Sequence, residues 1–393
     1  MKETYVIDAI RTPFGRFGGF LAGVRPDDLA ANLIRSLVTR SIELDWSLID
    51  DCILGDANGA GEDNRNVARM AVLLSGLPPS IPGATVNRLC GSGLEAVISA
   101  NRAIAVGDAS LVIAGGVESM SRAPWVLLKP ERAFPSASET LHSSTLGWRM
   151  VNPKMSPIWT VSLGEATEQL AERLHIDREA QDHFALASHL KAAQAWRLGE
   201  FEDEVIFEEL ADSQFDESLR FDASEESLAK LTPAFRPNGT ITAGNASPLN
   251  DGAAMLLLGD SAGIANSGRS PLARIVSRGV SAIEPHEFGI GPVQAAELAL
   301  IRAGITWDDV SLVELNEAFA AQSLACLRRW PGLDPSKVNI HGGAIAIGHP
   351  LGCSGARIVG HLAHSLHKRG GGFGLAAICI GVGQGLAMVL EGL

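Results

Sequence analysis

The chain has 393 residues, of which 46% are hydrophobic and 42 are glycine, so it is long enough for two or three packed units. Its net charge of −13 at pH 7 disfavours nucleic acid or an anionic membrane surface as a partner, because both bind basic faces. The five cysteines are odd in number, widely spaced and without a CxxC pair, which argues against a disulfide framework and against a structural zinc site.

No apolar run approaches the roughly 18 residues that a membrane helix needs. The first residues lead directly into a strand pattern, without the charged and then apolar segments of a signal peptide. Together with the cysteine usage, this predicts a cytoplasmic protein in a reducing compartment.

Strands and helices alternate in the first 120 residues, which is typical of an α/β unit whose sheet is covered on both faces. The predicted elements are, in order, a strand at 5–10, a helix at 27–41, a helical step into a strand at 48–55, a helix at 64–74, a strand leading to position 90, a helix after it, and a strand at 109–116.

The character of the chain changes at about residue 121. Prolines, tryptophans and charged residues replace the buried strands, and only two helical patterns stand out, at 164–174 and 178–200. A loop of small residues at 240–254 then leads into the buried run 255–258. We interpret this part as an inserted, more solvent-facing subdomain.

The last third repeats the first. Residues 46–54 share the pattern of 307–315, and residues 113–117 share that of 378–382. At a similar offset, Cys90 and the glycines after it correspond to Cys353 and Gly355. The chain is therefore predicted to contain two similar α/β halves, with a site at their junction.

The predicted units are an N-terminal half at 1–120, completed by about 248–270, an inserted loop subdomain at 121–247, and a C-terminal half at 271–393.

Cys90 is the first candidate for chemistry. It stands where an apolar run meets a glycine-rich turn and then a helical pattern, in NRLCGSG at 87–93. Backbone N–H groups and the helix dipole at such a junction favour a thiolate, so we expect a lowered pKa. Taken alone, a buried and inert cysteine is the commoner interpretation.

Three segments of the last third could cooperate with Cys90. His349 lies on a turn held by glycine and proline, Cys379 ends a buried strand before alternating glycines, and Asn316 is placed at the start of a helix. Asn316 could be only a helix cap. A nucleotide-binding glycine loop after Cys379 and a metal site at His341, His349 and Cys353 both fit poorly, because the spacings match neither pattern.

These segments together resemble the thiolase family, and the match runs from residue 5 to the C-terminus. The motifs that carry the resemblance are NRLCGSG at 87–93, NEAF at 316–319, GHPLG at 348–352 and CIGVGQG at 379–385. The resemblance implies a layered αβαβα core of two similar halves, plus an inserted loop subdomain.

The resemblance also implies the roles of five residues. Cys90 would be the acyl-accepting nucleophile and His349 the base that activates it, while Cys379 would exchange the proton at C2 of acetyl-CoA. Asn316 would hold a water that, with His349, binds the thioester oxygen. The N–H groups of Cys90 and Gly381 would form a second oxyanion hole.

Coenzyme A is the implied co-substrate, with no permanently bound cofactor and no metal. Its binding residues by the same resemblance are Arg220, Phe235, Ala243, Ser247 and Phe319. Two positions depart from the family pattern: Pro248 stands where glycine is usual, and His341 stands in VNIHGG where asparagine is usual, which puts in question the support of His349. The family also implies a homodimer or homotetramer.

The segments 61–70, 116–124 and 147–153 resemble 3-oxoadipyl-CoA thiolases, which cleave that substrate to succinyl-CoA and acetyl-CoA. Residues 159–168 depart from this subgroup, so a general 3-ketoacyl-CoA or acetoacetyl-CoA thiolase stays open. More remote alternatives are a ketoacyl synthase, which generally lacks a cysteine at position 379, and a non-catalytic carrier of coenzyme A or lipid, which would be expected to lose a catalytic residue.

Overall fold

The computed structural model describes residues 1–207 and 215–393. Its N-terminal elements are β1 (Thr4–Arg11), β2 (Gly15–Arg16), α1 (Pro26–Arg40), the 3₁₀ turn η1 (Trp46–Leu48), β3 (Asp51–Gly55), α2 (Val67–Leu74), β4 (Gly83–Val86), α3 (Ser92–Val106), β5 (Leu111–Ser119), β8 (Asn250–Gly259) and α7 (Ser261–Ser267). The later elements are β9 (Ala273–Ala282), η3 (Pro285–Ile290), α8 (Gly291–Ala303), η4 (Trp307–Asp309), β10 (Val310–Leu315), α9 (Ala320–Leu327), η5 (Pro335–Lys337), α10 (Ala344–Ile347), α11 (Leu351–Lys368), β11 (Gly372–Ile380) and β12 (Gln384–Gly392).

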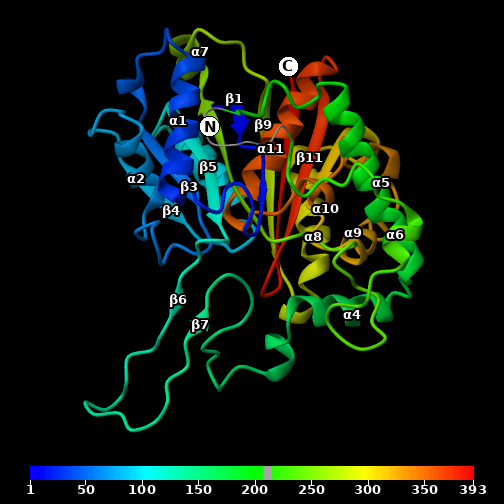
Figure 1. The fold of residues 1–393 in the computed structure, drawn as a ribbon. Coiled ribbons are helices and arrows are strands. Elements are labelled where there is room, and N and C mark those ends of the chain that lie inside the picture. Colours follow the sequence, from blue (N-terminus) through cyan, green and yellow to red (C-terminus); the bar gives the residue numbers. More distant parts are fainter. Residues whose placement is uncertain (208–214) are drawn as a thin grey trace.

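In its described residues, the segment between β5 and β8 holds few regular elements. They are β6 (Trp125–Val126), β7 (His142–Ser143), η2 (Pro157–Thr160), α4 (Leu163–Arg173), α5 (Arg178–Arg197) and α6 (Glu225–Ala229). In Figure 1, β6 and β7 lie on an arm that projects away from the body, whereas α4 and α5 pack beside the C-terminal elements.

One mixed sheet crosses the described residues in the strand order β10-β11-β12-β9-β1-β8-β5-β3-β4. Within it, β3 runs parallel to β5 and β10 runs parallel to β11, whereas β5 and β11 pair antiparallel with β8 and β12. A short antiparallel contact between β1 and β9, from Thr4 opposite Ile275 to Val6 opposite Ala273, joins the two repeated strand sets.

Helices form the other layers of the fold. Helices α1 and α2 cover the outer face of the β8 and β5 side, α8 covers the outer face of β9 and β12, and α3 and α11 lie together between the two strand sets. Strand β5 is buried at all nine positions because helices cover both of its faces. The α/β fold with an αβαβα arrangement of layers is therefore as predicted.

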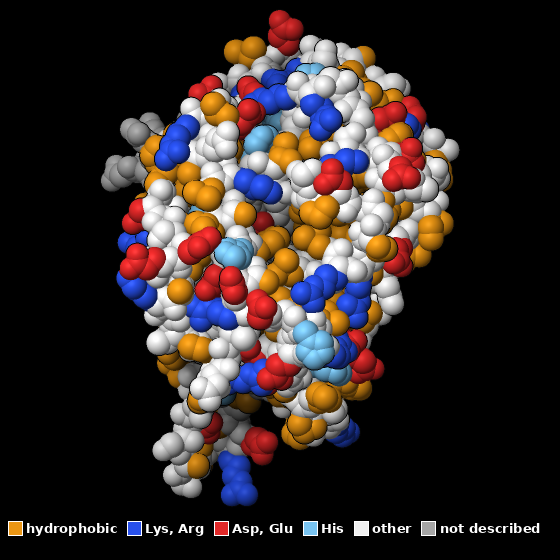
Figure 2. Space-filling model, turned by 90° about the vertical axis from the view of Figure 1, so that its right-hand side faces the viewer, with side chains coloured by type: hydrophobic (Ala, Val, Ile, Leu, Met, Phe, Trp, Pro, Cys, Tyr) orange, Lys and Arg blue, Asp and Glu red, His pale blue; other side chains and the backbone are white. Residues whose placement is uncertain are grey.

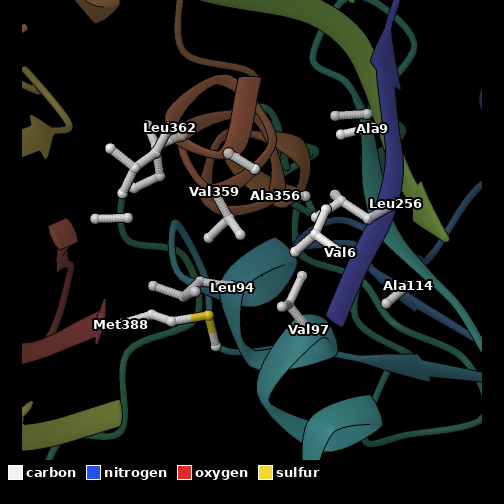
Figure 3. Packing of buried hydrophobic residues seen from close by; sticks show 14 of the residues in the cluster. Val6, Ala9, Leu94, Val97, Ala114, Leu256, Ala356, Val359, Leu362 and Met388 are labelled. Carbon is white, nitrogen blue, oxygen red and sulfur yellow. The ribbon is translucent and has the colours of Figure 1, made fainter. Parts of the chain in front are cut away.

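The central layer supplies the largest hydrophobic cluster. Figure 3 shows Leu94 and Val97 of α3 and Val359 of α11 packed together with residues of β1, β8 and β12. Helix α11 is buried from Gly352 to Ser365, because α3 and the two repeated strand sets enclose it. The residues at the N-terminal ends of α3 and α11 are therefore held in place by the hydrophobic core.

The surface carries mixed charges. Figure 2 shows lysine and arginine interspersed with aspartate and glutamate over the visible face, around hydrophobic side chains near its centre. No helix of the described residues is long and apolar enough to cross a membrane.

Candidate active site

Cys90 lies in a tight turn between β4 and α3. The preceding Leu89 has a left-handed backbone, with φ of 49°. The Ser92 hydroxyl donates to the Leu89 carbonyl at 2.7 Å and accepts the Arg88 N–H at 2.8 Å, which fixes the turn. Helix α3 begins at Ser92, so the sulfur is presented just before the helix.

The lowered pKa that we expected for Cys90 is wrong. Burial raises the pKa of the Cys90 thiol to about 11, although the backbone N–H of Gly381 hydrogen-bonds the sulfur and lowers it in part. The residue is only 8% exposed, so loss of hydration outweighs the backbone hydrogen bonds that favour the thiolate. Near pH 7 the sulfur is therefore protonated, as a thiol.

His349 lies on the turn between α10 and α11. Its N–H donates to the Asn250 Oδ1 atom at 2.8 Å, and its Nδ1 atom lies 2.6 Å from the Ser354 hydroxyl. That hydroxyl donates to the Pro350 carbonyl at 2.8 Å. Because a hydroxyl has one hydrogen, we assign Ser354 as the acceptor of the Nδ1 proton, which leaves Nε2 free to take a proton.

The imidazole is neutral as well. Burial, with a smaller effect from Arg357, lowers the pKa of His349 to about 3. Near pH 7, Cys90 is therefore a neutral thiol and His349 a neutral imidazole.

The two halves place Cys90 and His349 at equivalent positions. Cys90 stands two residues before the first residue of α3, and His349 stands two residues before the first residue of α11. The predicted equivalence of Cys90 and Cys353 is wrong, since Cys353 is the third residue of α11 and fully buried. Its pKa lies well above the usual range of a thiol because of burial.

Cys379 stands near the end of β11 and is 1% exposed. Burial, followed by the nearby Cys90, raises the pKa of its thiol well above the usual range. Phe288 and Phe319 belong to the same apolar cluster, so water has little access to this sulfur.

Asn316 does not stand at the start of a helix, contrary to the prediction from the sequence. It follows β10, and α9 begins only at Ala320, because Phe319 has an extended backbone and forms an isolated antiparallel bridge with Ala246 of the inserted segment. Its Nδ2 atom lies 3.4 Å from the His349 Nε2 atom. Among the described residues, its buried Oδ1 atom has no hydrogen-bond donor.

Glu317 and Ser354 are supporting residues that were not predicted from the sequence. The Glu317 carboxylate accepts hydrogen bonds from Ser188 and Asn339, both at 2.7 Å, which holds the 316–319 segment. The sequence signals for them were an acidic residue within the NEAF motif and a serine five residues after His349. His341 lies 3.1 Å from the His361 ring, and no hydrogen bond joins it to His349 among the described residues.

Gly381 begins the turn from β11 to β12. The next two residues, Val382 and Gly383, have left-handed backbones with φ of 65° and 74°. A Cβ atom on Gly383 would lie 2.3 Å from the Ile283 carbonyl oxygen, so the glycine is required by the fold. These glycines shape the turn that points the Gly381 N–H at Cys90.

One cavity of about 460 Å³ is lined by Cys90, His349 and Cys379 together. The predicted coenzyme A residues Phe235, Ala243, Ser247 and Phe319 line the same cavity.

A neighbouring cavity of about 450 Å³ is lined by Arg220 and shares Ala243 and Pro248 with the first. The structure thus brings the predicted coenzyme A residues to two adjoining cavities, whereas Asn316 and Gly381 line neither of the two.

Comparison with known proteins identifies the family. The family model described as "Thiolase, N-terminal domain" matches residues 4–262, and that described as "Thiolase, C-terminal domain" matches residues 269–392. The chain belongs to the thiolase family. It is therefore an acyltransferase.

Curated thiolases match this thiolase over its whole length. It is 52% identical to the beta-ketoadipyl-CoA thiolase of Escherichia coli, with 100% of both chains covered. It is 51% identical, with the same coverage, to the 3-oxoadipyl-CoA/3-oxo-5,6-dehydrosuberyl-CoA thiolase of Escherichia coli strain K12. The solved human mitochondrial 3-ketoacyl-CoA thiolase in complex with CoA matches with a TM-score of 0.93 and 37% identity, covering 100% of this chain and 98% of that one.

Proposed function

We propose that this thiolase cleaves 3-oxoadipyl-CoA with coenzyme A to succinyl-CoA and acetyl-CoA through an acyl group on Cys90. The observation that carries the proposal is the convergence of Cys90, His349 and Cys379 on one cavity. The curated relatives named as beta-ketoadipyl-CoA or 3-oxoadipyl-CoA thiolases support the choice of substrate.

In the first half-reaction, the Cys90 sulfur attacks C3 of the substrate while the His349 Nε2 atom takes the thiol proton. The bond between C2 and C3 then breaks, and its electron pair leaves on C2 as the enolate of acetyl-CoA. Cys379 protonates C2, which releases acetyl-CoA and leaves a succinyl thioester on Cys90. The high pKa of Cys379 suits it to this task, because a carbanion is a strong base.

In the second half-reaction, the Cys379 thiolate takes the thiol proton of coenzyme A, whose sulfur attacks the succinyl carbonyl. Cys90 leaves and recovers its proton from His349, so both groups return to their starting states. A water held by the Oδ1 atom of Asn316, together with His349, would bind the thioester oxygen of the enolate. The N–H groups of Cys90 and Gly381 would bind the oxyanion of the acyl group.

The adjoining cavities are assigned to coenzyme A. Phe235, Ala243, Ser247 and Phe319 would line the pantetheine channel, and the exposed Arg220 would lie at the nucleotide end. The Ser247 hydroxyl donates to the Ala318 carbonyl at 3.1 Å and so orients this channel wall.

The acyl-enzyme is testable by mass spectrometry. With 3-oxoadipyl-CoA and no added coenzyme A, we expect a succinyl group on the peptide that contains Cys90. Cys90→Ala should carry none, whereas Cys52→Ala, a buried cysteine of β3, should still be labelled on Cys90. Succinyl label on any other residue would refute the assignment.

The substrate is testable by steady-state kinetics. We expect kcat/KM to be higher for 3-oxoadipyl-CoA than for acetoacetyl-CoA or a long-chain 3-ketoacyl-CoA. A preference for the long chain would favour the alternative of a general 3-ketoacyl-CoA thiolase. The homodimer or homotetramer implied by the family stays a prediction.

A further inference from the structure

A smaller cavity of about 180 Å³ adjoins the catalytic cavity and shares Cys90 with it. Much of its lining is apolar, including Leu89, Leu163 and Leu351. It also contains one cationic side chain, Arg149, from the segment that follows β7. An arginine in a small, mostly apolar cavity beside Cys90 is a candidate for binding a polar group of a ligand.

Arg149 has unused capacity for hydrogen bonds. Its Nη1 atom lies 3.5 Å from the Ser144 carbonyl oxygen, and its Nη2 atom lies 3.4 Å from Asn58 Oδ1, both at the long limit of a hydrogen bond. Among the described residues, no carboxylate lies within 4.0 Å of its guanidinium group, which offers five N–H donors.

Two other half-buried arginines each have a carboxylate partner. Arg122 binds the Glu62 carboxylate through two nitrogen atoms, and Arg88 binds Glu95 at 3.0 Å. Arg149 is half-buried but lacks such a partner in the described part of the chain. A guanidinium group in this setting is suited to a planar anion supplied from outside.

The order of the cavities indicates which part of a substrate reaches Arg149. The cavity of Arg220 adjoins the catalytic cavity through Ala243 and Pro248, and the catalytic cavity adjoins the small one at Cys90. A thioester that enters from the Arg220 side would place its acyl chain beyond Cys90, in the small cavity.

We infer that Arg149 binds the terminal carboxylate of a dicarboxylic acyl group and so selects 3-oxoadipyl-CoA over uncharged chains of equal length. The inference rests on the proposed function and adds the residue that sets specificity. A carboxylate in this cavity without a cation would lose hydration uncompensated, whereas a methyl group there would leave the guanidinium group unpaired.

The alternative ligand for Arg149 is a phosphate of coenzyme A. The cavity order argues against it, because Arg16 and Arg220 already line the more polar cavity at the other end. The two possibilities differ in outcome: loss of a phosphate contact would weaken every substrate alike, whereas loss of a carboxylate contact would weaken only the dicarboxylic one.

The test compares two substrates of equal chain length, 3-oxoadipyl-CoA and 3-oxohexanoyl-CoA, which differ by a terminal carboxylate or methyl group. In Arg149→Gln we expect the ratio of kcat/KM for the charged over the uncharged substrate to fall about 10- to 100-fold, as for a lost charge-assisted hydrogen bond. Arg149→Lys should restore part of the ratio because it keeps the charge. The matched control is Arg132→Gln, at an exposed arginine, and it should leave the ratio of kcat/KM values unchanged.

Three results would contradict the inference, and they differ in what they mean for the proposed function. If the unmodified enzyme does not prefer 3-oxoadipyl-CoA, both proposals fail. If it does and Arg149→Gln keeps the preference, only the role of Arg149 fails. An equal loss for both substrates would assign Arg149 to coenzyme A binding or to folding, which also overturns it.

Discussion

At the scale of residues, the resting site pairs a neutral thiol with a neutral imidazole. Burial raises the pKa of Cys90 to about 11 and lowers that of His349 to about 3, so neither group is charged near pH 7. Such a pair holds no separated charges in a poorly hydrated cavity, and in the proposed mechanism the thiolate would form only as the carbonyl carbon is attacked.

The neutral pair predicts how alkylation depends on pH. Below its pKa the thiolate fraction of Cys90 rises about tenfold for each pH unit, so the rate of carbamidomethylation should climb steadily from pH 6 to pH 9. Mass spectrometry of the Cys90 peptide measures this rate, with Cys90→Ala as the background. A rate that is flat across this range would indicate a preformed thiolate and imidazolium pair.

Ser354 is predicted to orient the imidazole. Removing its hydroxyl in Ser354→Ala leaves the His349 Nδ1 atom without its 2.6 Å partner. We expect kcat to fall roughly tenfold, because the net free energy of one hydrogen bond usually corresponds to a factor of this size. Ser365→Ala, on the same helix three turns further, is the control and should change kcat little. Equal losses in both variants would show a general effect on α11.

At the scale of elements, α3 and α11 approach each other so closely that glycine is needed between them. A Cβ atom on Gly355 would lie 2.3 Å from the Leu94 backbone nitrogen, and one on Gly93 would lie 2.8 Å from that of Ala356. These contacts lie within the first two turns of each helix, directly after the nucleophile and the base. The spacing of Cys90 and His349 therefore depends on this packing.

Gly355→Ala tests that dependence. We expect the free energy of unfolding to fall by roughly 1–3 kcal/mol, as for other overpacked cores, and kcat to fall because both helix starts must shift. Chemical denaturation and steady-state kinetics measure the two effects. Gly23→Ala, where a side chain meets no atom within 4 Å, should stay within about 0.5 kcal/mol. Unchanged kcat in a destabilised Gly355→Ala would separate packing from catalysis.

At the scale of the whole molecule, the two halves share one core. The largest hydrophobic cluster contains Val97 of α3, Leu362 of α11, Leu256 of β8 and Met388 of β12. Neither strand set can expose its inner face without breaking this cluster, so the halves are expected to unfold together. The domain boundaries at about 120, 247 and 270 stay a prediction.

Hydrogen exchange in increasing denaturant tests this cooperativity. Amides of β3 in the first half and β10 in the second should exchange with the same free energy, because both require opening of the common core. Mass spectrometry of peptides that cover 51–55 and 310–315 measures the two values. A clearly lower value for one strand would show that its half opens alone.

The sequence by itself determined the fold class, the repeat and the identity of the candidate catalytic residues. Apolar runs, helical spacing and the motifs around Cys90, His349 and Cys379 are each formed by residues close together in the sequence. They can therefore be recognised without the structure. The glycine-rich turns were also readable, because a left-handed backbone such as that near Gly383 favours this residue wherever it occurs.

Only the tertiary structure decided the protonation states, the true equivalence of Cys90 with His349, and the place of Arg149. Each depends on groups distant in the chain: burial sets the two thiol pKa values, the starts of α3 and α11 set the equivalence, and the lining of one small cavity sets the surroundings of Arg149. Hydration and proximity are properties of the packed molecule, so no local pattern encodes them.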